Sequence, residues 1–244
     1  MDSGIADAAL VYALGIAVLN GLIHGYTGFG GALLMVPLLS VLYNPVEAIA
    51  MVGIATIFGS AQLYPAVARH AVWRELLPVF AGLVVFVPLG AYLLFHLDPQ
   101  LVRRSMGGFI LLFAVILMSG WIYRGPRGVV PSALVGALAG GITGASGVGG
   151  PPIALYYLAS PHPTEIQRAN IVISVAVMTV TVLTSVAVAG GFSIDVVLRG
   201  LFLTPAYLIG VWSGARLFIA VPKSYFRYAA LWLLMTTGIA VLVY

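Results

Sequence analysis

Long apolar segments are the feature that most restricts how this chain can fold. A helix needs about 20 apolar residues to cross a hydrocarbon core about 30 Å thick. Segments of this length, separated by short pieces that carry nearly all the charges, cover approximately 46–68, 75–96, 102–122, 165–189, 196–219 and 224–244. Only 7% of the residues are charged, whereas soluble domains have about a quarter. The sequence therefore predicts an all-α polytopic membrane protein whose surface faces a lipid bilayer.

Several functional classes are excluded at this level. The chain has no cysteine, which excludes a disulfide scaffold and a cysteine-based zinc or redox site. No run of basic residues is longer than Arg103-Arg104, so no nucleic-acid partner is expected. The H-E-x-x-H, Walker and Rossmann motifs are also missing. We therefore expect no cofactor, no metal site and no ATP-driven chemistry.

Two further regions, about 5–43 and 128–160, are each interrupted by a glycine-rich cluster. Residues 21–31 read GLIHGYTGFGG and residues 140–150 read GGITGASGVGG, and six of the eleven positions are identical at an offset of 119. Pro45 and Glu47 also correspond to Pro163 and Glu165. The pattern predicts two repeats, 1–124 and 125–244, each with a broken hairpin followed by three transmembrane helices.

The positions of the basic residues favour one topology over another. If each broken region crossed the membrane once, the 11 basic residues would divide into 6 and 5. If each region enters and returns, they divide into 8 and 3, as the positive-inside rule requires. The halves would then be inverted repeats with both termini outside. Residues 28–43 would form about 24 Å of helix, too short to cross, so each region is predicted to be a re-entrant helical hairpin.

The hairpin tips are the predicted substrate site. A glycine-rich turn that leads into a helix directs free N–H groups and a positive helix end at one point, which suits a small anion. The tip residues expected to bind the substrate are Thr27, Gly28, Gly30, Gly31, Ser146, Gly147, Gly149 and Gly150. The alternative is that these glycines only permit close helix crossing.

Other polar residues near the tips extend this candidate site. His24 lies one turn before the first tip, and either binds a proton or the anion or is a neutral histidine bonded to a carbonyl. Tyr26 adjoins the tip, and Thr143 is the repeat counterpart of His24. Arg168 and Asn170 open the span after the second hairpin; the arginine either contacts an oxyanion or is a flanking charge.

These motifs resemble the TauE/SafE family of membrane permeases. The resemblance rests on the two glycine clusters, on Pro37, on Gly149-Gly150-Pro151-Pro152 and on Arg168-Ala169-Asn170, and it extends over nearly the whole chain. It implies a bacterial-type inner-membrane transporter of sulfite, sulfonates or related small anions. The sequence does not distinguish H⁺ from Na⁺ as a coupling ion, or a monomer from an oligomer.

We expect the transporter to work by alternating access, with the anion held between the two tips. An uncoupled anion channel is the alternative. Residues 144–147, Gly-Ala-Ser-Gly, also match the G-x-S-G string of rhomboid intramembrane proteases. The only histidine that follows Ser146 is His162, which lies between two prolines. No enzyme activity is therefore expected, because nothing in the sequence would activate this serine.

Overall fold

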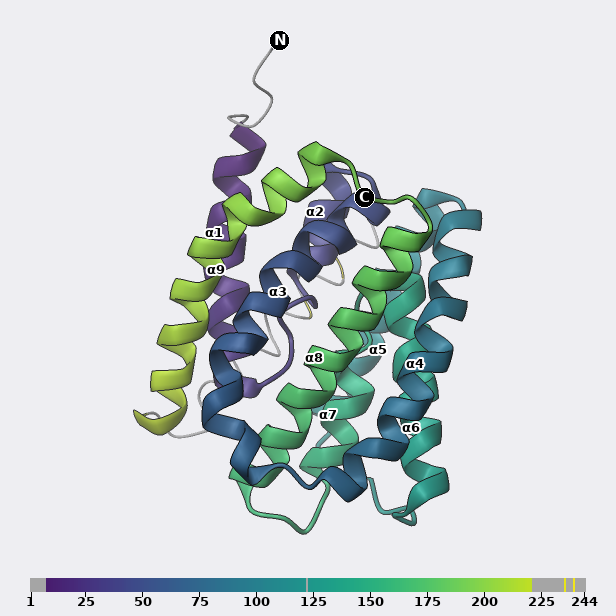
Figure 1. Cartoon of the computed structure of the whole chain (residues 1–244), viewed down its shortest axis with the longest axis vertical. Helices are drawn as coiled ribbons and strands as arrows, with labels where there is room; N and C mark the ends of the chain where they lie inside the picture. Colours follow the sequence, from purple (N-terminus) through teal and green to yellow (C-terminus); the bar gives the residue numbers. More distant parts are fainter. Residues whose placement is uncertain (1–7, 122, 221–234, 236–238, 240–244) are drawn as a thin grey trace.

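The structure, a computed structural model, describes residues 8–121, 123–220, 235 and 239. Helices and no strands make up this part of the chain (Figure 1). The helices of the first half are α1 (Ala8–Thr27), α2 (Met35–Leu42), α3 (Pro45–Val67), the 3-10 turn η1 (Ala68–His70), α4 (Trp73–His96) and α5 (Pro99–Met118). Those of the second half are α6 (Val129–Ser146), α7 (Gly150–Leu158), α8 (Thr164–Val188) and α9 (Ile194–Ala220).

Six helical segments in the described residues are long and apolar enough to cross a membrane. Five of them, formed by α3 with η1, α4, α5, α8 and α9, agree with the predicted spans. The sixth is α6, which the sequence analysis assigned to one arm of a hairpin. The predicted span 224–244 lies outside the described residues except for 235 and 239. The protein is therefore a multi-pass, all-helical membrane protein.

Polar caps and prolines mark where α3 and α5 begin. The side chain of Asn44 accepts a hydrogen bond from Val46 N (3.0 Å) in front of α3, and Asp98 accepts one from Gln100 N (2.8 Å) in front of α5. A proline follows each cap at the first helical position, where its missing N–H costs nothing. Glu47 and Glu165, which correspond in the two repeats, lie in the first turns of α3 and α8.

Two helix pairs cross at glycines. Helix α1 packs along α9, and α6 packs along α4. A Cβ atom at Gly25 would overlap the carbonyl oxygen of Val211, and one at Gly144 would overlap that of Val87. Such backbone contact is how small residues hold membrane helices together. The close-crossing role considered for the glycine clusters therefore applies to these two glycines.

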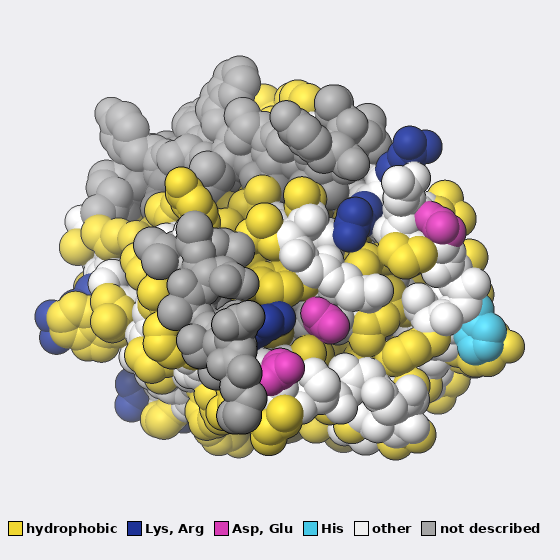
Figure 2. Space-filling model, turned by 90° about the horizontal axis from the view of Figure 1, so that it is seen from above, with side chains coloured by type: hydrophobic (Ala, Val, Ile, Leu, Met, Phe, Trp, Pro, Cys, Tyr) yellow, Lys and Arg dark blue, Asp and Glu magenta, His cyan; other side chains and the backbone are white. Residues whose placement is uncertain are grey.

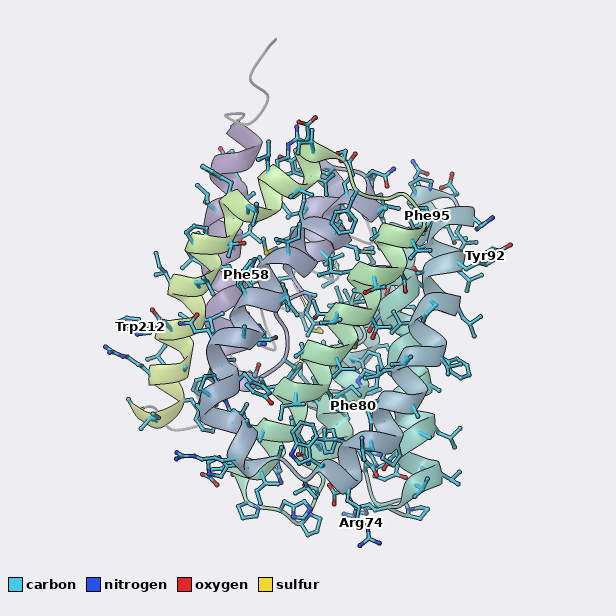
Figure 3. All side chains as sticks on the ribbon, in the orientation of Figure 1. Phe58, Arg74, Phe80, Tyr92, Phe95 and Trp212 are labelled. Atoms are coloured by element: carbon cyan, nitrogen blue, oxygen red, sulfur yellow. The ribbon has the colours of Figure 1, made fainter. Side chains whose placement is uncertain are left out.

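The two helix pairs lie on either side of α3 and α8, which pack on each other (Figure 1). Helix α1 runs down from the upper end of the view, and α2 lies in the upper part again; α6 rises from the lower end, where α7 also lies. Figure 3 shows Tyr92 and Trp212 on opposite flanks, and these side chains are 63% and 49% exposed. Charged side chains lie among hydrophobic ones on the upper end, seen in Figure 2. The apolar flanks are the surfaces that suit lipid.

Candidate functional site

The first glycine-rich turn, residues 28–34, connects α1 to α2. Gly28 and Gly30 have φ values of +82° and +93°, which glycine adopts without strain. The Thr27 hydroxyl donates to Ile23 O (2.7 Å) and accepts from Phe29 N (3.2 Å). Phe29 O is a second acceptor within reach of this hydroxyl, so Thr27 joins the end of α1 to the first residues of the turn.

The expectation that this first cluster leads directly into a helix is wrong. Residues 31–34 form turns, and α2 begins only at Met35. The Asn20 side chain accepts a hydrogen bond from Met35 N (3.2 Å) and donates to Ile16 O (3.0 Å). A side chain of α1 therefore holds the start of α2, because the intervening turn leaves the N–H of Met35 without a helical acceptor.

The second turn is tighter and follows the prediction more closely. Gly147 ends α6 in the left-handed conformation with φ +73°, and its N–H donates to Thr143 O (2.7 Å). Helix α7 begins at Gly150, with prolines in its first turn. The Ser146 hydroxyl is fully buried and donates to Ile142 O (2.7 Å). A Cβ atom at Gly149 would overlap the Thr143 hydroxyl, so this turn has no room for a side chain there.

The two turns meet at one small, partly open cavity of about 30 Å³. A Cβ atom at Gly150 would lie 3.8 Å from Phe29 Cβ and 4.0 Å from Gly30 N, so the start of α7 lies close to the first turn. The cavity is lined by Gly30, Gly31, Gly147, Val148 and Gly150 of the turns, by Thr143, and by residues of α3 and α8 that include Thr56 and Thr179. Its walls are mainly apolar, with hydroxyls and glycine backbone as the polar groups.

His24 lies behind the first turn and is fully buried. Its Nδ1 forms a 2.6 Å hydrogen bond with the Tyr207 hydroxyl of α9, while its Nε2 has no hydrogen-bond partner in the described part of the chain. A Cβ atom at Gly31 would overlap the Tyr207 oxygen and lie 2.8 Å from His24 Nδ1. Glycine is thus the only residue type that fits at position 31, between the cavity and the His24–Tyr207 pair.

Arg168 reaches the first turn from the second half of the chain. Its Nη2 donates to Gly25 O (2.6 Å), one of the last carbonyls of α1, and its Cζ lies 4.6 Å from the Phe218 ring centroid. A Cβ atom at Gly28 would lie 3.3 Å from its Cγ. A positive charge at a helix C-terminus is favourable. This arginine therefore stabilises the end of α1 beside the first glycine turn.

The remaining predicted residues have different surroundings. Thr143 lines the cavity and its hydroxyl donates to Ala139 O (2.7 Å). Tyr26 is buried and packs edge-on against Phe218, with ring centroids 5.7 Å apart. Asn170 is fully buried but accepts from Val72 N (3.0 Å), before α4. The structure therefore does not bring Asn170 to the glycine turns.

The sequence analysis missed three hydroxyl residues of this site, Thr56, Thr179 and Tyr207. Each lies in the middle of an apolar helix, and a polar residue buried in a membrane helix is itself a signal of function. That signal was available in the sequence. Among the described residues, no group of three His, Asp or Glu side chains is close enough to hold a metal ion.

Comparison with known proteins gives one match. A family model described as sulfite exporter TauE/SafE matches residues 13–241. No curated protein and no solved structure matches the chain significantly. The matched range includes both glycine-rich turns and every helix that lines the cavity.

Proposed function

Because the chain belongs to the sulfite exporter TauE/SafE family, we propose that it is a secondary transporter of small anions, sulfite and organosulfonates in particular. The single observation that carries this proposal is the cavity shared by the two glycine-rich turns. The anion would occupy an expanded form of it and would interact with backbone N–H groups of both turns. The membrane would be a bacterial-type inner membrane, with both termini outside.

The short helices α2 and α7 support a re-entrant arrangement. They contain 8 and 9 residues, about 12 to 14 Å of helix at 1.5 Å per residue, which is too short to cross a core of about 30 Å. Each positive helix end lies near a turn that lines the cavity, which favours an anion there. Pro151 and Pro152 lack N–H groups, so Gly149 and Gly150 would be the main backbone donors of the second turn.

The helix packing supports an inverted repeat. Exchange of the two halves converts the α1–α9 pair into the α6–α4 pair, and both pairs exist. The exchange likewise converts the packing of α3 on α9 into that of α8 on α4. Helices α1 and α6 run in opposite directions in Figure 1. Movement of one glycine-crossed pair against the other would open the cavity first to one side and then to the other.

The size of the cavity favours a carrier over an uncoupled channel. A cavity of about 30 Å³ accommodates little more than ordered water, so it would have to expand before it could accept an anion. A protease is disfavoured because the Ser146 hydroxyl is bonded to Ile142 O, while His162 is bonded to Glu75 (2.9 Å).

Counterflow in proteoliposomes tests the proposal. Vesicles preloaded with unlabelled isethionate or sulfite should take up the labelled anion several times faster than empty ones, because a carrier returns loaded faster than empty. Equal rates with and without preloading would indicate a channel. Absence of saturable uptake for sulfite, isethionate and sulfoacetate alike would overturn the proposed function.

A further inference from the structure

A buried polar chain leads from the cavity to His24. Thr56 of α3 lines the cavity and lies beside the Tyr207 hydroxyl, although its Oγ1 forms no hydrogen bond within the described residues. The Tyr207 hydroxyl forms a hydrogen bond with His24 Nδ1 (2.6 Å). Gly31 covers the same hydrogen bond from the cavity side. The histidine is therefore within one residue of the place where the anion would bind, yet its Nε2 has no partner in the described residues.

Among the described residues, the charged groups around His24 include no carboxylate. Arg168 of α8 is near enough for its charge to act on the ring, and Tyr207 is the titratable group in contact. Helices α1 and α2 carry no charged residue in their described ranges. The charges of α9 lie away from the ring: Arg199 and Arg216 are against Tyr43 and Trp212, and Asp195 is in the first turn.

The only charged residue of α3, Glu47, is also distant from the histidine. It lies in the first turn of α3, 12 residues before Gly59, which packs against Tyr207. That separation is about 18 Å along the helix. A proton on His24 would therefore add a second buried positive charge beside Arg168, with no negative group of the described chain to balance it.

We propose that His24 binds a proton together with the transported anion, so that the protein is an H⁺–anion symporter. This inference rests on the proposed function, because a bound anion supplies the negative charge that the site lacks. An anion in the cavity makes protonation of His24 favourable, and a protonated His24 makes anion binding favourable. One monovalent anion then moves with one proton, and no net charge crosses the membrane.

The hydrogen bonds change in a defined way when the proton binds. A neutral imidazole has one N–H, and an imidazolium has two. After protonation, Nδ1 donates to the Tyr207 oxygen and Nε2 becomes a second donor. The Tyr207 hydroxyl proton then turns toward another acceptor, and Thr56 is beside it. An anion bound near Gly31 would thus favour the protonated ring in two ways, through its negative charge and through the orientation of the Tyr207 hydroxyl.

The test measures anion and proton movement in the same proteoliposomes. Labelled isethionate is used because its sulfonate stays ionised across the pH range, and a trapped pH dye reports the lumen. An inward isethionate gradient should acidify the lumen of wild-type vesicles. Uptake should rise about tenfold per unit fall in external pH while the protonated form is scarce, because the binding-competent fraction rises with proton concentration.

Two variants test whether His24 is the residue that binds the transported proton. His24→Gln should lose at least nine-tenths of the acidification per isethionate transported, and its uptake should not vary with pH. Tyr207→Phe keeps the ring and removes the hydroxyl, so it should weaken the pH dependence without abolishing uptake. His96→Gln is the matched control, since His96 bonds to Tyr92 O on the exposed side of α4, and it should behave as wild type.

Each outcome separates this inference from the proposed function. Saturable uptake of isethionate in wild type without lumen acidification would overturn proton coupling and leave the transporter intact. Full acidification in His24→Gln would overturn the assignment to this residue. If His24→Gln does not transport, a weaker pH dependence of uptake in Tyr207→Phe together with normal pH dependence in His96→Gln supports the inference. Unchanged pH dependence in Tyr207→Phe would then overturn it.

Discussion

Gly147→Ala is the sharpest test of the second glycine turn. Gly147 has a φ of +73°, and an L-residue in this conformation costs about 1–2 kcal/mol. The added Cβ would lie 2.9 Å from Ile49 Cγ1 and 3.1 Å from Val36 Cγ1. Overpacking of this kind costs about 1 kcal/mol or more. The substitution should therefore destabilise the protein by about 2–3 kcal/mol.

The control is Gly141→Ala in the same helix, α6. No heavy atom lies within 4 Å of a Cβ atom at Gly141, and its backbone is helical. Alanine is favoured over glycine in a helix by up to about 1 kcal/mol, so this variant should be as stable as wild type or more stable. Both substitutions add one methyl group, and they differ in backbone conformation and surrounding space.

Thermal unfolding in detergent, followed by the fluorescence of the four tryptophans, measures the difference. A loss of 2–3 kcal/mol corresponds to a fall in Tm of about 4–12 °C for a chain of this size. Isethionate uptake should also fall about tenfold or more, because 1.4 kcal/mol of distortion at the site is a factor of ten in affinity. If Gly147→Ala melts within about 2 °C of Gly141→Ala, the turn does not require glycine and the reasoning is refuted.

Four further substitutions test the packing. Gly90→Val should prevent α4 from packing on α6, because its Cβ would overlap the carbonyl oxygen of residue 141; size-exclusion chromatography should then show little monodisperse protein. Asn20→Ala removes the acceptor for the first N–H of α2 and should cost about 1 kcal/mol in thermal unfolding, as loss of a helix cap does. Glu75→Gln removes an ion pair with His162 whose side chains are 33% and 29% exposed, so the loss should stay below about 1 kcal/mol. Asn170 is fully buried and accepts a hydrogen bond from Val72 N. Asn170→Ala should therefore cost more, about 1–3 kcal/mol.

The membrane-spanning helices were predictable because length and apolar composition alone define them. The separate roles of neighbouring glycines were not. Gly25 and Gly28 both match the second repeat in sequence. In the structure Gly25 packs against the backbone of α9, whereas Gly28 has positive φ in the turn. The sequence identifies both glycines, but it does not predict their backbone conformations, because these depend on where α1 ends.

The directions in which polar side chains point could not be predicted from the sequence either. Arg168 and Asn170 are two positions apart on α8, a rotation of about 200° around the helix axis. Arg168 consequently contacts the end of α1, and Asn170 contacts the segment before α4. The bond between His24 and Tyr207 joins residues 183 positions apart. Such a pairing depends on the packing of α1 against α9, which hydropathy does not specify.

The two glycine turns share a backbone design but differ in the side chains around them. Beside Gly28 lies Arg168, whereas Ile49 lies beside Gly147. His24 precedes the first turn at the position that Thr143 holds before the second. Among the described residues, cationic and titratable groups are thus concentrated at the first turn, whereas the second turn has hydroxyls, backbone groups and the Met178 sulfur beside it. Under the proposed mechanism, the first turn would determine the charge and protonation of the bound anion, and the second would hold its uncharged end. Substrates with a sulfonate at one end and a short neutral or hydroxyl group at the other fit this asymmetry better than dianions with two charged ends.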